Sequence, residues 1–336
     1  MNVNVAAHFP TKSQFSKDVL LLDAAAEVER IVEELRRQVV ATFGRRGAVI
    51  GLSGGIDSSV VAALCVRAFG KDKVLGIFMP EHHSSEDSLR LGRSWASQLD
   101  IRTVLEDISP ALESLGAYRR QIEAIRTVVP EYGDGWKCKL VLPPILAGNR
   151  LNITYLTVQG PDGTRNVRLS SDAYLQIVAA TNYKQRVRKM TEYYHADRLR
   201  YAVAGTPNRL EHDQGFFVKQ GDGVADVMPI AHLYKTQVYQ LAEYLCVDEE
   251  IRRRPPTTDT FSMPQSQEEF YFSLPYHLMD LCLFAVNNGI APDVVAEVVG
   301  LTADQVEIVF RDIGAKRRAT RYLHARPALV AQVFED

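Results

Sequence analysis

The sequence predicts an α/β fold: an open parallel sheet flanked by helices, with an inserted β-hairpin and a helical C-terminal part. Apolar runs of strand length alternate with helix-length amphipathic segments over the first 110 residues or so. A short turn of glycines and serines joins the first of these strands to a helix. Such alternation indicates parallel strands, because each crossover helix returns the chain to the same edge of the sheet.

The elements follow in order along the chain. Residues 1–17 are polar and unpatterned and are expected to form an N-terminal arm, and residues 23–43 show helical spacing closed by Gly44. The strands are expected at residues 48–52, 74–79, 102–108 and 200–204. The helices are expected near residues 57–69, 84–98, 112–128, 172–194 and 236–246.

The segment 130–171 interrupts this alternation. Residues 151–158 and 166–170 have strand character and are joined through Gly160-Pro161-Asp162-Gly163, which favours a hairpin turn. No linker composition separates this segment from its surroundings. We therefore expect residues 18–336 to form a single domain in which 130–171 is an insertion and 260–336 a mostly helical extension.

Composition limits the classes of protein. Hydrophobic residues make up 46% and charged residues 24% of the 336 positions, which is typical of a globular protein. A net charge of −2 argues against a general nucleic-acid or membrane-surface binder, and no apolar run approaches the span of about 20 residues that a membrane helix needs. The cysteines are scattered without a Cys-x-x-Cys pair, which favours buried thiols in a reducing compartment: Cys65, Cys138, Cys246 and Cys282. These features predict a cytoplasmic enzyme.

The glycine turn reads Ser53-Gly54-Gly55-Ile56-Asp57-Ser58-Ser59. A loop of small residues between a strand and a helix suits an anion held on backbone N–H groups at the helix N-terminus. Asp57 would repel a phosphate unless a cation lay between them, which predicts Mg²⁺. The loop matches neither a Walker sequence nor a Rossmann fingerprint. The alternative is a structural corner that needs two glycines.

This loop resembles the pyrophosphate loop of the N-type ATP pyrophosphatases, which implies an adenine nucleotide alpha hydrolase-like fold. Further motifs extend the resemblance: Asn182-x-x-x-Arg186-x-Arg188, Gly205-Thr206-Pro207-Asn208-Arg209-Leu210-Glu211, the run from Gly215 to Asp226, Lys235, Pro256-Thr257-Thr258-Asp259 and Lys316-Arg317-Arg318. With these motifs the chain resembles the NAD synthetase family over residues 24–320, apart from the inserted hairpin.

The resemblance implies roles for individual residues. ATP would be bound by Gly51, Ser53, Gly54, Gly55, Asp57, Ser58, Thr206, Lys235 and Thr257. Mg²⁺ would be held by Asp57 and Glu211, and the dinucleotide substrate by Arg186, Lys219, Asp226 and Lys316. Catalysis would depend on Asp57, Lys219 and Lys235. Each has a simpler interpretation: Asp57 and Glu211 as helix caps, the basic residues as solvated surface charges.

The implied reaction is the ATP-dependent amidation of a carboxylate through an acyl-adenylate, with release of AMP and pyrophosphate, and deamido-NAD is the expected substrate. No glutaminase domain is expected in this chain, so the nitrogen is expected from free ammonia or from a separate glutaminase. Family resemblance also predicts a homodimer, with residues 23–43 and the C-terminal helices as candidate contacts.

Three departures from the family pattern concern the substrate side: the inserted hairpin, the segment from Glu268 to Tyr276, and Ala315 in place of a histidine that many members carry. They leave open an amide ligase of the same fold that acts on another carboxylate, such as a sugar acid or a natural-product intermediate. A tRNA-modifying pyrophosphatase is a weaker alternative, because paired cysteines and a basic surface are missing. The segment 292–302 also resembles a helix-turn-helix.

Overall fold

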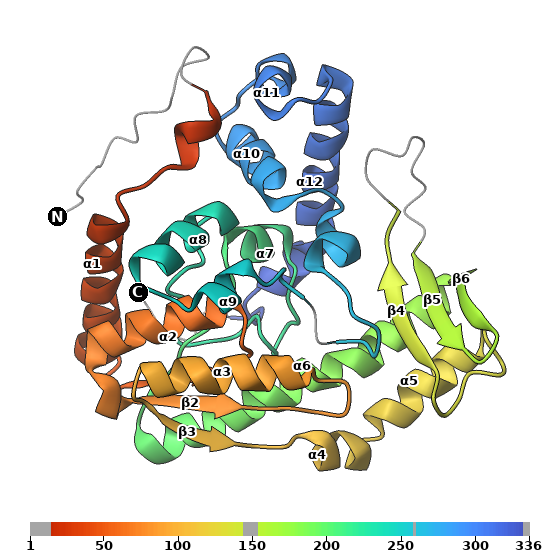
Figure 1. Cartoon of the computed structure of the whole chain (residues 1–336), viewed down its shortest axis with the longest axis horizontal. Coiled ribbons are helices and arrows are strands. Elements are labelled where there is room, and N and C mark those ends of the chain that lie inside the picture. The colour runs from red at the N-terminus through yellow and green to blue at the C-terminus, as the bar shows by residue number, and fades with distance from the viewer. Residues whose placement is uncertain (1–14, 144–153, 258–259, 332–336) are drawn as a thin grey trace.

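The computed structural model describes residues 15–143, 154–257 and 260–331 (Figure 1). Its main sheet has four parallel strands in the order β3-β2-β1-β7. The strands are β1 (Ala48–Gly51), β2 (Val74–Phe78), β3 (Arg102–Leu105) and β7 (Ala202–Val203), and each lies inside a segment expected from the sequence. The predicted fold class, an open parallel sheet flanked by helices, is confirmed.

Alternating residues of the central strand divide the core between two faces. Ala48 and Ile50 pack into a cluster with α1 (Ala24–Leu35), α2 (Ile56–Phe69) and α8 (Lys235–Tyr244). Val49 faces the opposite cluster, which contains residues of β2, α4 (Ser109–Ser114), α5 (Ala117–Arg126) and α6 (Ser171–Leu199). This alternation follows from the two-residue period of a strand buried on both faces.

The first helix begins at the N-cap Asp23, whose carboxylate accepts a hydrogen bond from Ala26 N, and it continues as a π-helical segment, Arg36–Thr42. Gly44, with a φ of 60°, ends it as expected. The apolar face of α1 is fully used inside the chain, because Val28, Ile31, Val32 and Leu35 are all buried in the main core. The apolar spacing of α1 is therefore explained by packing within the chain, whereas Val40 and Phe43 farther along the same segment are exposed, and a dimer contact at residues 23–43 stays a prediction.

One predicted helix is wrong as a single element. Residues 112–128 belong to two helices, α4 (Ser109–Ser114) and α5 (Ala117–Arg126). Gly116, with a φ of 67°, interrupts the helix between them, in a backbone conformation that glycine adopts most readily. The remaining described helices of this part are α3 (Glu86–Gln98), α6 (Ser171–Leu199), α7 (Arg209–Gln214) and α9 (Glu249–Arg253).

The insertion forms a small antiparallel sheet at one end of the molecule (Figure 1). The predicted hairpin is confirmed in β5 (Tyr155–Gly160) and β6 (Gly163–Arg168), although residues 151–153 of the first predicted strand lie outside the described residues. Sequence reasoning missed a third strand, β4 (Lys137–Val141), which pairs with β5. Cys138 and Leu140 of that strand pack toward α5 and the start of α6, so the insertion is a three-stranded sheet and not a hairpin alone.

The C-terminal part is helical, as expected. A π-helical segment, Glu268–Phe272, leads into α10 (Tyr276–Asn287), α11 (Pro292–Val299) and α12 (Ala303–His324), which enclose a core of their own. Phe15 stacks on Phe284 in that core with ring centroids 6.3 Å apart, so the end of the expected N-terminal arm packs against these helices. None of the helices in the described ranges combines the length and apolar character needed to cross a membrane.

Candidate active site

A cavity of about 980 Å³ opens at the carboxyl-terminal edge of the main sheet. It brings together many of the residues singled out in the sequence: Gly51, Ser53, Gly55, Asp57, Ser58, Arg186, Thr206, Glu211, Lys219, Thr257 and Lys316. Open parallel sheets bind their ligands at this edge, where strand ends and helix N-termini converge. Gly54, Lys235 and Asp226 do not line the cavity, and each has a separate role in the structure.

The loop after β1 is braced by its own serines. The hydroxyls of Ser58 and Ser59 both donate to the carbonyl of Gly55, at 3.0 and 2.9 Å, and Ser53 Oγ lies 3.1 Å from Ser58 Oγ. Gly54 has a φ of 70°, and a Cβ there would lie 2.2 Å from the carbonyl oxygen of Ser88 on α3. Gly54 therefore allows close packing. The first residues of α2 line the cavity, and the N–H groups at a helix start, which lack partners within the helix, would suit an anion there.

A polar cluster sits beside this loop. Lys235 Nζ, whose side chain is fully buried, lies 2.5 Å from Asp57 Oδ2, and Asn208 Nδ2 donates to Asp57 Oδ1 at 3.2 Å. Asp57 accepts these hydrogen bonds from side chains on other elements, so it is not a cap of its own helix. Lys235 does not line the cavity itself. It lies behind the wall, where its ammonium pairs with the Asp57 carboxylate.

Glu211 is a helix cap and also a cavity residue. Its Oε2 accepts from Asn208 N at 3.0 Å and Asn208 Oδ1 accepts from Glu211 N at 3.2 Å, which is a capping box at the start of α7. Burial and the nearby Asp57 carboxylate raise the pKa of Glu211 to about 8. Two close carboxylates that share one lysine form a site that a divalent cation would stabilise.

The residues present fit Mg²⁺ in one particular way. Within the described ranges, no group of three or more His, Cys, Asp or Glu side chains is arranged to hold a metal ion. Mg²⁺ commonly takes only one or two carboxylates, with the remaining positions filled by substrate phosphates and water. Asp57 and Glu211 match that pattern better than a site built from protein ligands alone.

Asp280 fixes the position of Lys235. The Asp280 carboxylate accepts from the backbone N–H groups of Lys235 and Thr236, at 3.3 and 2.7 Å, at the start of α8. Burial raises the pKa of Asp280 to about 6. Its place in the sequence gives no hint of this role, because 45 residues separate it from Lys235.

The opposite end of the cavity carries basic side chains that donate to backbone carbonyls. Arg186 Nε donates to Lys219 O at 3.3 Å, and Lys219 Nζ donates to the carbonyls of Tyr322 and Ala325 at 2.8 and 3.1 Å. Lys316 Nζ donates to Tyr271 O at 2.8 Å and also lies 2.8 Å from Asp312 Oδ2, with which it forms an ion pair. All three basic residues line the cavity, and their binding of a substrate stays a prediction.

Asp226 lies elsewhere. Its Oδ2 accepts from Val203 N at 2.7 Å, and its Oδ1 accepts from the Tyr193 hydroxyl at 3.3 Å, beside the short strand β7. The acidic residue of this segment that lines the cavity is instead Asp222, four residues earlier, which accepts from Val218 N. Burial raises the pKa of Asp222, and Lys189 and Arg188 oppose that shift.

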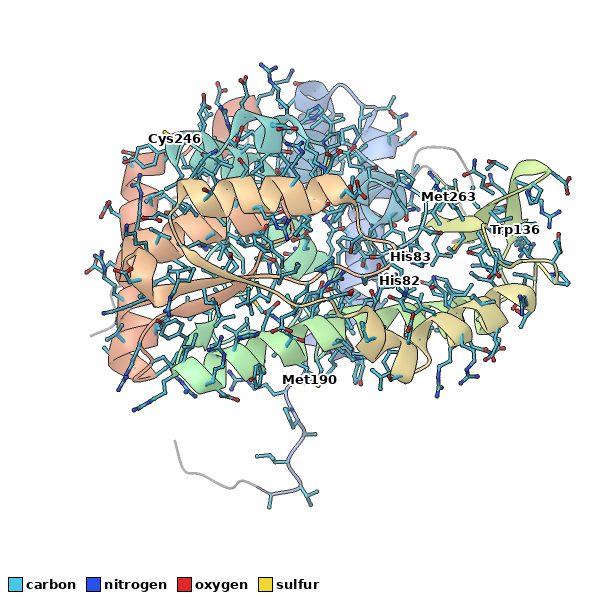
Figure 2. All side chains as sticks on the ribbon, turned by 60° about the horizontal axis from the view of Figure 1, so that its bottom comes forward. His82, His83, Trp136, Met190, Cys246 and Met263 are labelled. Carbon is cyan, nitrogen blue, oxygen red and sulfur yellow. The ribbon has the colours of Figure 1, made fainter. Side chains whose placement is uncertain are left out.

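Sequence reasoning missed a buried cluster behind the cavity. Lys184 Nζ donates to Glu81 Oε1 at 3.0 Å and to Thr260 O at 2.8 Å, and lies 3.0 Å from His83 Nδ1. Figure 2 labels His83 and its neighbour His82, whose rings both lie against Tyr118 of α5, while Lys184 comes from α6. Burial and the charge of Lys184 lower the pKa of His83 to about 4.

A second missed pair, Lys189 and Glu192, lines the cavity from the same helix. The helix has no single apolar stripe, since neighbours cover it on several sides along its 29 residues. A lysine in such a helix looks in sequence like a solvated residue, so no pattern separates the buried charges from the exposed ones.

Helix α12 brings Lys316 to the cavity wall and packs Val306, Val309 and Ile313 into the C-terminal core. The segment that resembles a helix-turn-helix in sequence thus forms α11 and the start of α12, which pack into that core, and α12 also lines the cavity. Phe270 and Tyr271, which depart from the family pattern, line the same wall, and Tyr271 stacks on Phe216 with ring centroids 4.7 Å apart.

Comparison with known proteins gives three findings. The family profile described as NAD synthase matches residues 27–129 and 149–320. The chain is similar to a protein of Mesorhizobium japonicum named NH(3)-dependent NAD(+) synthetase, with 75% identity over 319 residues that cover 95% of this chain and 100% of that protein. A protein of Rhizobium rhizogenes with the same name is 57% identical over 323 residues, covering 96% and 97%.

The solved structures agree on the fold. An NH3-dependent NAD synthetase from Campylobacter jejuni, in complex with a nitrate ion, aligns with a TM-score of 0.60 at 20% identity. The alignment covers 92% of this chain and 100% of that one. At 20% identity the likeness supports the fold alone. The family assignment depends on the profile match and on the relatives of high identity.

Proposed function

The chain belongs to the NAD synthase family, and from that premise we propose that it amidates deamido-NAD through an acyl-adenylate and releases AMP and pyrophosphate. It is a ligase that forms a carbon–nitrogen bond, using ATP and ammonia to make NAD. The observation that carries the finer proposal is the cluster of Asp57, Lys235, Asn208 and Glu211 beside a helix N-terminus suited to phosphate.

The chemistry explains why ATP is cleaved between its α- and β-phosphates. A carboxylate resists ammonia because its leaving group would be oxide. A carboxylate oxygen therefore bonds to the α-phosphorus while the bond to the bridging oxygen breaks, and pyrophosphate leaves. Ammonia then attacks the acyl carbon and AMP leaves with the bonding electrons, while the nitrogen gives up its extra proton. Positioning and charge stabilisation by the protein are sufficient for both steps.

The residues of the loop end suit the first step. The backbone N–H groups of residues 55–58 and the hydroxyls of Ser53 and Ser58 would bind the departing phosphates. Lys235 holds Asp57 in place, and Thr206 and Thr257 line the same cavity. A Mg²⁺ ion held by Asp57 and Glu211 would neutralise charge on pyrophosphate as it leaves.

The residues of the opposite end suit the dinucleotide. Arg186, Lys219 and Lys316 present cations to the cavity, and a guanidinium can bind a phosphate or carboxylate through two parallel hydrogen bonds. Asp226 remains a proposed substrate residue from family resemblance, although its carboxylate is engaged by Val203 N and Tyr193 here.

The products of ATP test this proposal. Purified protein with ammonium, Mg²⁺, ATP and deamido-NAD is expected to yield NAD, AMP and pyrophosphate in equal amounts. ADP and phosphate in their place would refute the adenylation route. A parallel panel of sugar acids and other small carboxylates tests the alternative amide ligase, which would be supported if one of these released AMP while deamido-NAD did not.

Three further parts of the proposal concern the surroundings of the enzyme. We propose that it acts in the cytoplasm on free ammonia, or on ammonia from a separate glutaminase, and that it forms a homodimer through a surface other than the buried face of α1. Light scattering at micromolar concentration tests the dimer, and a monomeric mass would contradict it.

A further inference from the structure

A buried ion pair on α6 forms part of the cavity wall. Lys189 and Glu192 lie one helical turn apart, with Lys189 Nζ 2.6 Å from Glu192 Oε2, and their side chains are only 8% and 9% exposed. Both residues line the cavity. Burying such a pair is expensive in desolvation and is weak evidence for a purely stabilising role. A ligand in the cavity could use any acceptor of the pair that no protein group occupies.

The second carboxylate oxygen of Glu192 has no protein partner within the described ranges. Oε2 accepts from Lys189, while no described residue donates to Oε1. Oε1 lies against the carboxyl end of β1, because a Cβ added to Gly51 would be only 2.8 Å from it and 3.0 Å from Met79 Cε. A buried acceptor that faces a cavity is expected to receive a hydrogen bond from whatever fills that cavity.

The position of Oε1 indicates what the donor is. Gly51 stands two residues before Ser53, where the anion-binding loop begins, and β1 lies between β2 and β7 at the centre of the sheet. Phosphates would be repelled by the Glu192 carboxylate, so the part of a nucleotide next to it must be neutral and carry donors. A ribose has two adjacent hydroxyls, and acidic residues at the edges of parallel sheets bind such hydroxyls.

We propose that Glu192 Oε1 accepts a hydrogen bond from a ribose hydroxyl of bound ATP, and that Lys189 holds the carboxylate in the required orientation. The proposal rests on the proposed function, since it takes ATP as the ligand of the loop end. It also explains Gly51: a side chain at that position would fill the space that the Glu192 carboxylate occupies.

The test compares ATP analogues on the wild type and on a matched double variant, Lys189→Met with Glu192→Leu. This variant removes the acceptor and leaves no unpaired charge, and replacing a buried ion pair by apolar residues of similar size is often neutral for stability. The substrates are ATP, 2′-deoxyATP, 3′-deoxyATP and the purine riboside triphosphate that lacks the 6-amino group.

The wild type is expected to favour ATP over at least one deoxy analogue by about 10- to 100-fold in kcat/KM, as for a hydrogen bond to a charged group. In the double variant kcat/KM for ATP should fall to the value for the deoxy analogue, so the preference is lost. The kcat/KM for that analogue and the KM for deamido-NAD should stay unchanged. Three results would overturn the proposal: a preserved preference, a loss confined to the analogue without the amino group, or an effect on the KM of the dinucleotide alone.

Two controls keep the outcomes distinct. If the double variant fails to fold, Glu192→Gln takes its place, and its weaker amide acceptor is expected to reduce the preference about 3- to 10-fold; an unchanged preference would overturn the proposal. If the wild type makes no AMP from ATP, the proposed function fails, and calorimetric titration with ATP and the deoxy analogues still measures the effect of Glu192 on binding.

Discussion

The two ends of the cavity hold their charged groups in different ways. At the loop end, Asp57 is fixed by Lys235 and Asn208, and Lys235 is fixed in turn by Asp280. At the opposite end, Arg186, Lys219 and Lys316 each donate to backbone carbonyls, and Lys316 also pairs with Asp312. The loop end is therefore held by contacts between side chains. The opposite end is held largely by hydrogen bonds to carbonyls, which a bound anion could replace, and the ion pair of Lys316 with Asp312 is the exception.

This difference separates two tasks. Transition-state charge is stabilised best by groups that are already in place, because no reorganisation is then needed during the reaction. A large substrate has to enter and leave, so cations that exchange a carbonyl for a phosphate suit its binding. Variants of the loop end should therefore lower kcat, and variants of the opposite end should raise the KM of the dinucleotide.

The largest effect is expected at Asp57. Asp57→Asn keeps the side-chain shape and its contact with Asn208 but removes the charge that Lys235 and a metal ion would meet. We expect kcat to fall about 1000-fold or more, from lost metal binding and charge stabilisation together. Steady-state rates over a Mg²⁺ titration measure this, with the melting temperature as control for folding.

A wild-type rate in Asp57→Asn would leave only the structural interpretation of the loop. Both variants remove the ion-pair partner of the fully buried Lys235, but Asp57→Ala is the less informative one because it also removes the acceptor of the Asn208 hydrogen bond. Unpairing a buried charge can lower the free energy of unfolding by about 3–5 kcal/mol, which would mix folding with catalysis.

A smaller effect is expected at Lys219. Its ammonium lies 3.9 Å from the centre of the Tyr322 ring as well as donating to two carbonyls. Lys219→Ala should raise the KM for deamido-NAD by about 10-fold, the loss of one charged hydrogen bond, and leave the KM for ATP unchanged. Lys219→Arg keeps the charge and serves as the matched control. A fall in kcat alone, with both KM values unchanged, would show that the two ends do not divide the tasks in this way.

The loop end could be predicted well because its determinants are local in the sequence. The loop from Ser53 to Ser59 and the capping box of Asn208 and Glu211 are short motifs attached to strand ends, and their meeting follows from the parallel sheet. The separate roles of Gly54 and Lys235 could not be predicted, since close packing on α3 and burial behind Asp57 depend on neighbours far along the chain.

The remaining surprises share a physical cause. The strand β4 has alternating buried residues, yet it is only five residues long and its partner strand begins fourteen residues after it ends. The break at Gly116 competes with a helical pattern that continues on both sides. Lys184, Lys189 and Glu192 are charged residues buried by tertiary contacts, and residue type alone predicts that they are exposed.

The smallest effect is expected at His83, in the buried cluster around Lys184, and concerns the stability of the fold in acid. The pKa of His83 is lowered to about 4 by burial and by Lys184, whose ammonium also donates to Thr260 O. Below pH 6.5 the unfolded chain binds a proton at His83, whereas the folded chain binds it only near pH 4. The free energy of unfolding therefore falls as the pH drops from 6.5 to about 4. His83→Gln should remove this loss, which we place at about 1–2 kcal/mol by pH 4.5 because the ring is partly exposed. Urea unfolding of both proteins between pH 7 and 4.5 measures it, with the exposed His82 as the control site. If the free energy of unfolding fell equally with pH in the wild type and in His83→Gln, protonation of His83 would make no contribution to the loss of stability in acid.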